Sequence, residues 1–145
     1  MLRVGFILNF NKDKWRGGYE YIKNLISLIR EVKNQNIKIT ILTSNNFNNA
    51  YFKDLGKVDI KKSIFLENNN FYRILHKILV IILGKNLFLE NFLKTNKINF
   101  LSHFYFLGKN SGINNLYWIP DFQEVKMLKY LSFKQKMMRK ISISC

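Results

Sequence analysis

The sequence predicts an α/β fold built on a doubly wound, mostly parallel sheet, because short apolar runs alternate with longer amphipathic stretches. Residues 2–9 form a nearly continuous apolar run, the pattern of a parallel strand that is covered on both faces. Residues 19–34 repeat apolar side chains with the period of a helix, and residues 37–43, rich in isoleucine and threonine, read as a second strand. The chain therefore opens with a strand, a helix and a strand.

The rest of the chain continues this alternation. Gly and Asn clusters separate the apolar segments, and Pro120 ends the last apolar run. The further elements expected, in chain order, are a short helical turn over 51–55, an edge strand over 59–66, helices over 71–83 and 87–95, strands over 98–104 and 116–119, and a partly helical basic segment over 127–141. In a sheet of this kind, ligands bind outside the carboxyl ends of the strands.

The helix expected over residues 71–83 is apolar on more than one face. It could pack in the core between the sheet and its neighbours, which we favour. Alternatively, its outer face could touch lipid while Arg73, Lys77 and Lys85 contact headgroups. The run from Ile74 to Leu83 is about half as long as a bilayer crossing requires, so we expect no transmembrane segment.

The composition is that of one basic globular domain. The 145 residues suffice for one domain with its own core but not for two, so residues 1–145 are treated as a single domain. The formal net charge of +15 favours partners that carry phosphate groups. The single cysteine, Cys145, excludes a disulfide framework and a cysteine-based zinc site.

The turn over residues 14–18 joins the first strand to the first helix and contains the pair Gly17-Gly18. Free N–H groups and the helix dipole favour an anion at such a position, and glycines let a ligand approach the backbone closely. The spacing differs from the G-x-G-x-x-G dinucleotide motif and from the Walker motif. The turn is therefore either an anion site or a tight turn whose small residues let the helix pack on the strand.

Two stretches carry a resemblance to a known family. The first is Trp15-Arg16-Gly17-Gly18-Tyr19, and the second is Trp118-Ile119-Pro120-Asp121-Phe122-Gln123, followed by Leu131-Ser132 and a basic helix. Together they resemble the amino-terminal domain of bacterial glycosyltransferases of the GT-B fold, in the group of family 4, or glycosyl transferases group 1. The resemblance covers essentially the whole chain but less than half of the family's enzyme.

The resemblance implies a Rossmann-like, acceptor-side domain of an enzyme that moves a sugar from a nucleotide-sugar donor to a glycan or lipid-linked acceptor, as a hexosyltransferase does. Because the resemblance covers only the acceptor side, we expect the carboxyl-terminal donor-binding domain to be missing and the chain to be truncated and inactive alone. It also implies no metal and no cofactor besides the nucleotide sugar as donor substrate. The expected role is in cell-envelope glycan biosynthesis.

The resemblance also assigns roles to individual residues. By position, Gly17 and Gly18 would bind the donor diphosphate, while Asp121 is the candidate catalytic residue, as general base or acceptor ligand. The residues expected to line the acceptor side of the cleft are Trp15, Arg16, Asp121, Gln123 and Glu124. Glu124 stands where family members usually have histidine, which puts intact chemistry in doubt. His103 and His76 are interpreted as hydrogen-bonded histidines of apolar elements.

Two other functions remain open from the residues alone. A stand-alone basic module could bind nucleic acid, with aromatic residues among the lysines stacking on bases. It could also bind an anionic membrane surface. We favour the glycosyltransferase interpretation over nucleic-acid binding, and expect a cytoplasmic protein with peripheral contact to the inner face of the membrane.

Overall fold

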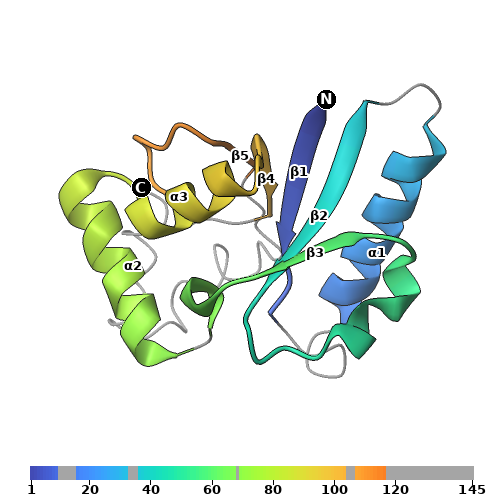
Figure 1. The fold of residues 1–145 in the computed structure, drawn as a ribbon, viewed down its shortest axis with the longest axis horizontal. Helices are drawn as coiled ribbons and strands as arrows, with labels where there is room; N and C mark the ends of the chain where they lie inside the picture. Colours follow the sequence, from blue (N-terminus) through green and yellow to red (C-terminus); the bar gives the residue numbers. More distant parts are fainter. Residues whose placement is uncertain (10–15, 33–35, 68, 104–106, 117–145) are drawn as a thin grey trace, which may run out of the picture.

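A computed structural model of the chain describes residues 1–9, 16–32, 36–67, 69–103 and 107–116. It contains a five-stranded parallel sheet in the order β3-β2-β1-β4-β5 (Figure 1). The strands are β1 (Leu2–Ile7), β2 (Ile37–Thr43), β3 (Asp59–Lys62), β4 (Phe100–Ser102) and β5 (Asn114–Leu116). The predicted α/β class with a parallel sheet is confirmed.

Helices and short 3-10 turns connect these strands. The α-helices are α1 (Arg16–Glu31), α2 (Asn70–Leu83) and α3 (Leu87–Thr95), and the 3-10 turns are η1 (Asn49–Leu55) and η2 (Ile64–Leu66). The chain passes from β1 through α1 to β2, and later crosses from β3 through α2 and α3 to β4. β1 is thereby flanked by β2 and β4, and Gly5 lies opposite both Thr40 and Leu101.

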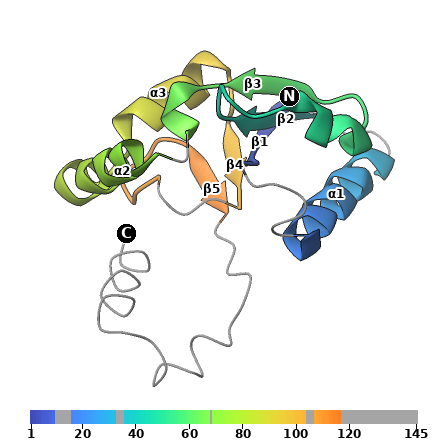
Figure 2. The same ribbon diagram turned by 90° about the horizontal axis from the view of Figure 1, so that it is seen from below.

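Two apolar cores cover the two faces of the sheet. Successive side chains of β1 point to opposite faces, so β1 contributes to both cores. Val4, Phe6 and Leu8 belong to one core, which they share with Ile22 and Ile26 of α1. The second core joins residues from β2, α3, β4 and the loops that follow: Leu42, Leu66, Leu89, Leu93, Ile98, Leu101, Leu107 and Ile113. The two views accordingly place α1 and α3 on opposite sides of the sheet (Figure 2). Such two-sided burial explains why residues 2–9 read as a continuous apolar run.

Several element bounds differ from those expected. α1 begins at Arg16, so Gly17 and Gly18 lie in the first turn of the helix and not in the turn that precedes it. Only the first part of the run over 59–66 is a strand, because β3 lies at the sheet edge and the chain then turns into η2. β4 and β5 have three residues each, and β5 begins at Asn114, before the expected start at Leu116.

The outer position of α2 corrects one expectation. α2 has the predicted length and ends at Gly84, whose φ of 67° is the left-handed conformation typical of a residue that stops a helix. Yet it lies at the periphery, beyond α3 from the sheet (Figure 1), and most of its isoleucines are exposed. The preferred interpretation of this segment as a core helix is therefore wrong for its outward face. Within the described ranges, the helices are all too short or too polar to cross a bilayer.

Candidate functional site

The strand order changes direction between β1 and β4, where parallel sheets commonly bind ligands. The chain leaves β1 toward β2 on one side, whereas β4 and β5 lie on the other side, so the connections diverge between these two neighbouring strands. In parallel sheets, such a divergence leaves a crevice at the carboxyl ends of the strands. Leu8 and Asn9 follow β1 at this end, and His103 follows β4.

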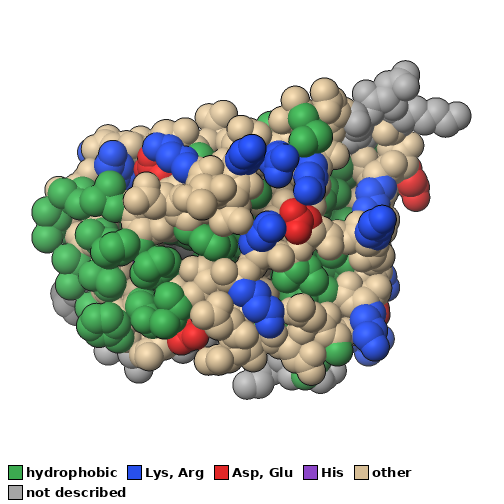
Figure 3. Space-filling model, in the orientation of Figure 1, with side chains coloured by type: hydrophobic (Ala, Val, Ile, Leu, Met, Phe, Trp, Pro, Cys, Tyr) green, Lys and Arg blue, Asp and Glu red, His purple; other side chains and the backbone are tan. Residues whose placement is uncertain are grey.

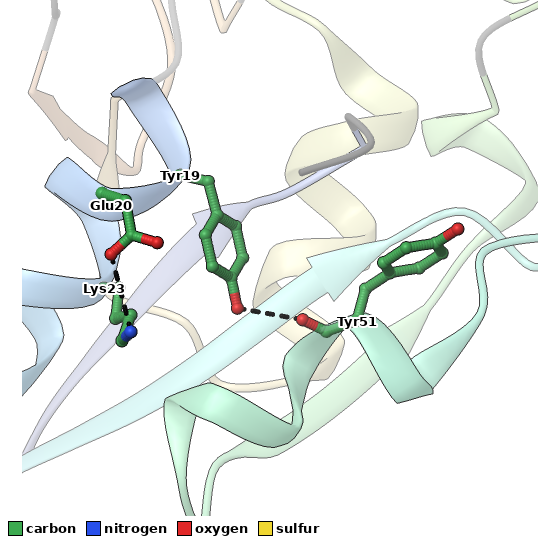
Figure 4. Close-up of polar contacts among 4 residues, drawn as sticks. All are labelled: Tyr19, Glu20, Lys23 and Tyr51. Carbon is green, nitrogen blue, oxygen red and sulfur yellow. Dashed lines mark hydrogen bonds and ion pairs between the residues drawn. The ribbon is translucent and has the colours of Figure 1, made fainter. Parts of the chain in front are cut away.

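The first turn of α1 borders this position. Gly17 is exposed, and a methyl group placed on its Cα would meet no atom within 4 Å, so the backbone is open to a ligand. Gly18 is buried. The next residue anchors the turn, because the hydroxyl of the buried Tyr19 donates a hydrogen bond of 2.9 Å to the carbonyl of Tyr51 in η1 (Figure 4).

The surface side of the same turn carries a weaker contact. Glu20 and Lys23 form a partly exposed ion pair at 3.5 Å along the helix (Figure 4). Such a pair adds little to stability because water screens it. Of the two contacts in Figure 4, the hydrogen bond of Tyr19 is therefore the one that positions the amino terminus of α1 against the rest of the domain.

His103 lies where β4 ends and holds an uncommon backbone conformation, with φ at 64°. Its N–H donates to the carbonyl of Leu116 over 2.9 Å, which ties it to β5. Its ring stacks on Phe6, with the centroids 6.1 Å apart, and meets the ring of Tyr21 edge-on at 5.4 Å. Nδ1 is hydrogen-bonded to the hydroxyl of the buried Ser102, and Nε2 lies 3.3 Å from the Tyr21 hydroxyl.

Tyr21 links this histidine to the open turn of α1. Gly17 and Tyr21 are four residues apart on one helix, so they lie on the same face of α1. The exposed backbone at Gly17 and the half-buried ring of His103 thus border the same face of the domain. Partial burial lowers the pKa of His103 below its ordinary value of 6.5, because it removes water from the charged form. At neutral pH the imidazole is therefore uncharged, with one nitrogen donating and the other accepting.

Asn9 braces the adjoining strand ends. Its Oδ1 accepts hydrogen bonds from the Thr43 hydroxyl at 2.9 Å and from the Ser44 N–H at 2.8 Å, and its amide nitrogen donates to the carbonyl of Leu66. The Thr43 hydroxyl also lies 2.8 Å from the carbonyl of Leu8. Since β1, β2 and η2 meet through one side chain, this corner of the carboxyl edge is held rigidly.

The structure describes only part of the predicted site. Gly17, Gly18 and Arg16 all lie in the first turn of α1, and Arg16 is exposed. Trp15, Asp121, Gln123 and Glu124 lie outside the described residues, so their placement in a cleft stays a prediction. The sequence predicts His103 inside a strand, as a hydrogen-bonded histidine; its ring nitrogens do have hydrogen-bond partners, in Ser102 and Tyr21. In the structure, His103 follows the last residue of β4, beside Tyr21.

Comparisons with known proteins leave the family open. No family model, no curated protein and no solved structure matches this chain. The glycosyltransferase resemblance therefore stays a prediction, and the geometry at the carboxyl edge of the sheet is the basis for a functional proposal. Within the described segments, His, Cys, Asp and Glu side chains do not gather in groups of three that could hold a metal ion.

Proposed function

We propose that this chain is the amino-terminal, acceptor-side portion of a glycosyltransferase that moves a sugar from a nucleotide-sugar donor to a glycan or lipid-linked acceptor. The observation that carries the proposal is the meeting of an open helix amino terminus at Gly17 with a neutral, partly exposed imidazole at His103. Tyr21 joins the two, and all three lie at the divergence point of a parallel sheet.

The two groups suit the two halves of a sugar-transfer reaction. The amino terminus of a helix such as α1 favours a diphosphate, whose negative charge increases as it leaves the sugar. A neutral imidazole can accept a hydrogen bond from a sugar or acceptor hydroxyl. The bond between His103 Nε2 and the Tyr21 hydroxyl is long at 3.3 Å, so an incoming hydroxyl can replace it at little cost.

The site would be completed by a domain that binds the nucleotide and faces the carboxyl edge of the sheet. Residues 1–145 would supply the acceptor side, with the +15 charge attracting phosphate-bearing substrates. We therefore expect no transferase turnover from the 145-residue polypeptide alone. Steady release of nucleotide diphosphate from a nucleotide sugar by this polypeptide would contradict that expectation.

Binding to the site is testable by NMR on the full chain. Inorganic pyrophosphate and uridine diphosphate should shift the amide signals of Gly17, Gly18 and Tyr19, and the ring signals of His103 should respond to a glycan acceptor. Gly17→Ala should weaken the diphosphate response, because a methyl group there occupies the open approach. Gly112→Ala is the matched control. Gly112 is also exposed, but it precedes β5 and so lies near the amino-terminal ends of the strands, away from Gly17.

Two outcomes would overturn the proposal. Amide shifts spread over the lysine-bearing surface, reproduced by sodium chloride at equal ionic strength, would show general electrostatic binding. Tighter, salt-dependent binding of single-stranded oligonucleotides than of diphosphates would favour the nucleic-acid module instead.

A further inference from the structure

The outward face of α2 is a continuous apolar stripe. Phe71, Ile74, Ile78, Ile81 and Ile82 recur at the helical period and lie on one side of the helix. Their exposed fractions run from 46% for Ile78 to 72% for Ile82. We call these five side chains the apolar face of α2. In the space-filling view, apolar side chains gather over this end of the molecule (Figure 3).

The opposite side of α2 is fixed to the domain, so the exposure does not come from a loosely placed helix. Val80 is buried. His76 accepts a hydrogen bond from the Asn86 amide at Nδ1, over 2.6 Å, and its Nε2 lies 2.7 Å from the carbonyl of Phe65. A helix that is held on its inner side, yet apolar on its outer side, presents a surface suited to a partner.

The charge around the apolar face is positive. Residues 70–83 contain no aspartate or glutamate, and Lys77 lies within the helix. Lys85 follows its end, and Lys109 belongs to a turn held there by the Asn110 N–H, which donates to the carbonyl of Gly84 over 2.9 Å. Figure 3 shows lysine or arginine side chains along one border of the apolar region, with an acidic side chain among them and another acidic side chain at the lower border.

We propose that α2 docks on an anionic lipid bilayer, with its axis parallel to the membrane and its apolar face in the headgroup region. Its 14 residues make a rod of about 21 Å, long enough to lie in the interface and too short to cross it. Charge complementarity favours this occupant over a second copy of the chain, because two copies would bring lysines together without acidic partners on α2. The proposal does not depend on sugar transfer.

Vesicle sedimentation with the full chain tests the docking. The protein should sediment with vesicles that mix phosphatidylcholine with phosphatidylglycerol, less with phosphatidylcholine alone, and less again as salt screens the lysines. The double variant Ile78→Ser/Ile82→Ser should lower the partition coefficient roughly ten- to a hundredfold, because each isoleucine withdraws several apolar carbons from water on insertion.

The matched control is Leu28→Ser/Val32→Ser at the carboxyl end of α1, where the two side chains are exposed by 59% and 61%. This pair removes the same kind of side chain away from α2, so its partition coefficient should equal that of the unaltered protein. Both double variants should keep the unfolding midpoint of the parent, since all four side chains are exposed.

Three results would overturn the proposal. The protein could stay in the supernatant with mixed vesicles at low salt. A concentration-dependent dimer that Ile78→Ser/Ile82→Ser abolishes would identify a second copy as the occupant. A marked fall in the unfolding midpoint of that variant, without vesicles, would show that another part of the chain covers the face.

Discussion

His103 combines a strained backbone with a well-packed ring. A non-glycine residue at positive φ costs on the order of 1 kcal/mol, and such residues concentrate at functional sites. Here the ring contacts with Phe6 and Tyr21 and the hydrogen bond to Ser102 hold the conformation. The strain therefore supports the assignment of His103 to the site at the carboxyl edge of the sheet.

Titration of His103 should couple pH to stability. Its pKa is lower in the folded chain than the ordinary 6.5, so the unfolded chain binds a proton more readily. This contribution to the free energy of unfolding is fully present above about pH 6.5 and is lost as the pH falls toward the folded-state pKa. Urea unfolding at a series of pH values should show this loss. His103→Gln should remove that part of the pH dependence. If the free energy of unfolding depended on pH in the same way in this variant, His103 would not be the group whose pKa is lowered by folding.

Gly17→Ala should stabilise the domain. The first turn of α1 leaves room for the methyl group, and alanine loses less backbone entropy than glycine when a helix forms. We expect a gain of about 0.5 kcal/mol in the free energy of unfolding, measured by urea denaturation. A stability loss would show that the backbone at Gly17 needs a conformation that alanine resists.

At this scale the sequence locates the start of α1 to within one helical turn but does not locate the histidine at the end of β4. Gly17 and Gly18 can be placed at the entry of α1 because local spacing marks a strand followed by a helix. His103 reads as part of the apolar run over 98–104, since the end of β4 depends on pairing with β1, about a hundred residues earlier. The role of Asp121 rests on the resemblance and on its place after Pro120 at the end of an expected strand, where a turn-forming aspartate is the alternative.

Asn86 lies in the short connection between α2 and α3 and is hydrogen-bonded to both helices. Its buried side chain accepts a hydrogen bond from the Leu89 N–H at the start of α3, and its amide binds His76 of α2. Its own N–H donates to the carbonyl of Leu107 over 2.9 Å. Asn86 therefore helps to orient α2 and its apolar face, together with the bond between His76 Nε2 and the carbonyl of Phe65.

Asn86→Ala should destabilise the domain by about 2 kcal/mol, because it removes the helix cap and leaves the ring nitrogen of His76 without its donor. The control is Asn69→Ala, which removes the exposed cap of α2 and should cost about 1 kcal/mol or less. Urea unfolding of both variants checks the difference. Equal losses would mean that the bond to His76 contributes nothing.

Elements with local signals were predicted well, and elements that depend on neighbours were not. β2 has the predicted bounds, Ile37–Thr43, because it is rich in β-branched residues and lies buried between two neighbouring strands. β3 and β5 are edge strands, whose lengths follow from one neighbour only. The periodicity of α2 could not separate core from surface, because a helix with apolar residues on both sides reads as buried.

Across the whole molecule, Gly5 sets how closely the central strands and the second core approach one another. A methyl group on its Cα would come within 2.9 Å of Leu42 Cδ1 and 3.1 Å of Ile98 Cγ2. Gly5→Ala should therefore lower the free energy of unfolding by about 1–3 kcal/mol through overpacking, opposite in sign to Gly17→Ala. Urea unfolding of Gly5→Ala and of the unaltered protein measures this difference in the free energy of unfolding. A neutral result would mean that the second core yields more readily than its burial indicates.

The central place of β1 also determines the order in which the chain can be completed during synthesis. Arg3 is hydrogen-bonded to Asn99, 96 residues later. At about 5–20 residues per second, the amino-terminal strand is made about 5–20 s before its second neighbour. One edge of β1 is therefore unpaired throughout that interval, and a nascent-chain chaperone that shields extended apolar segments would find its substrate there.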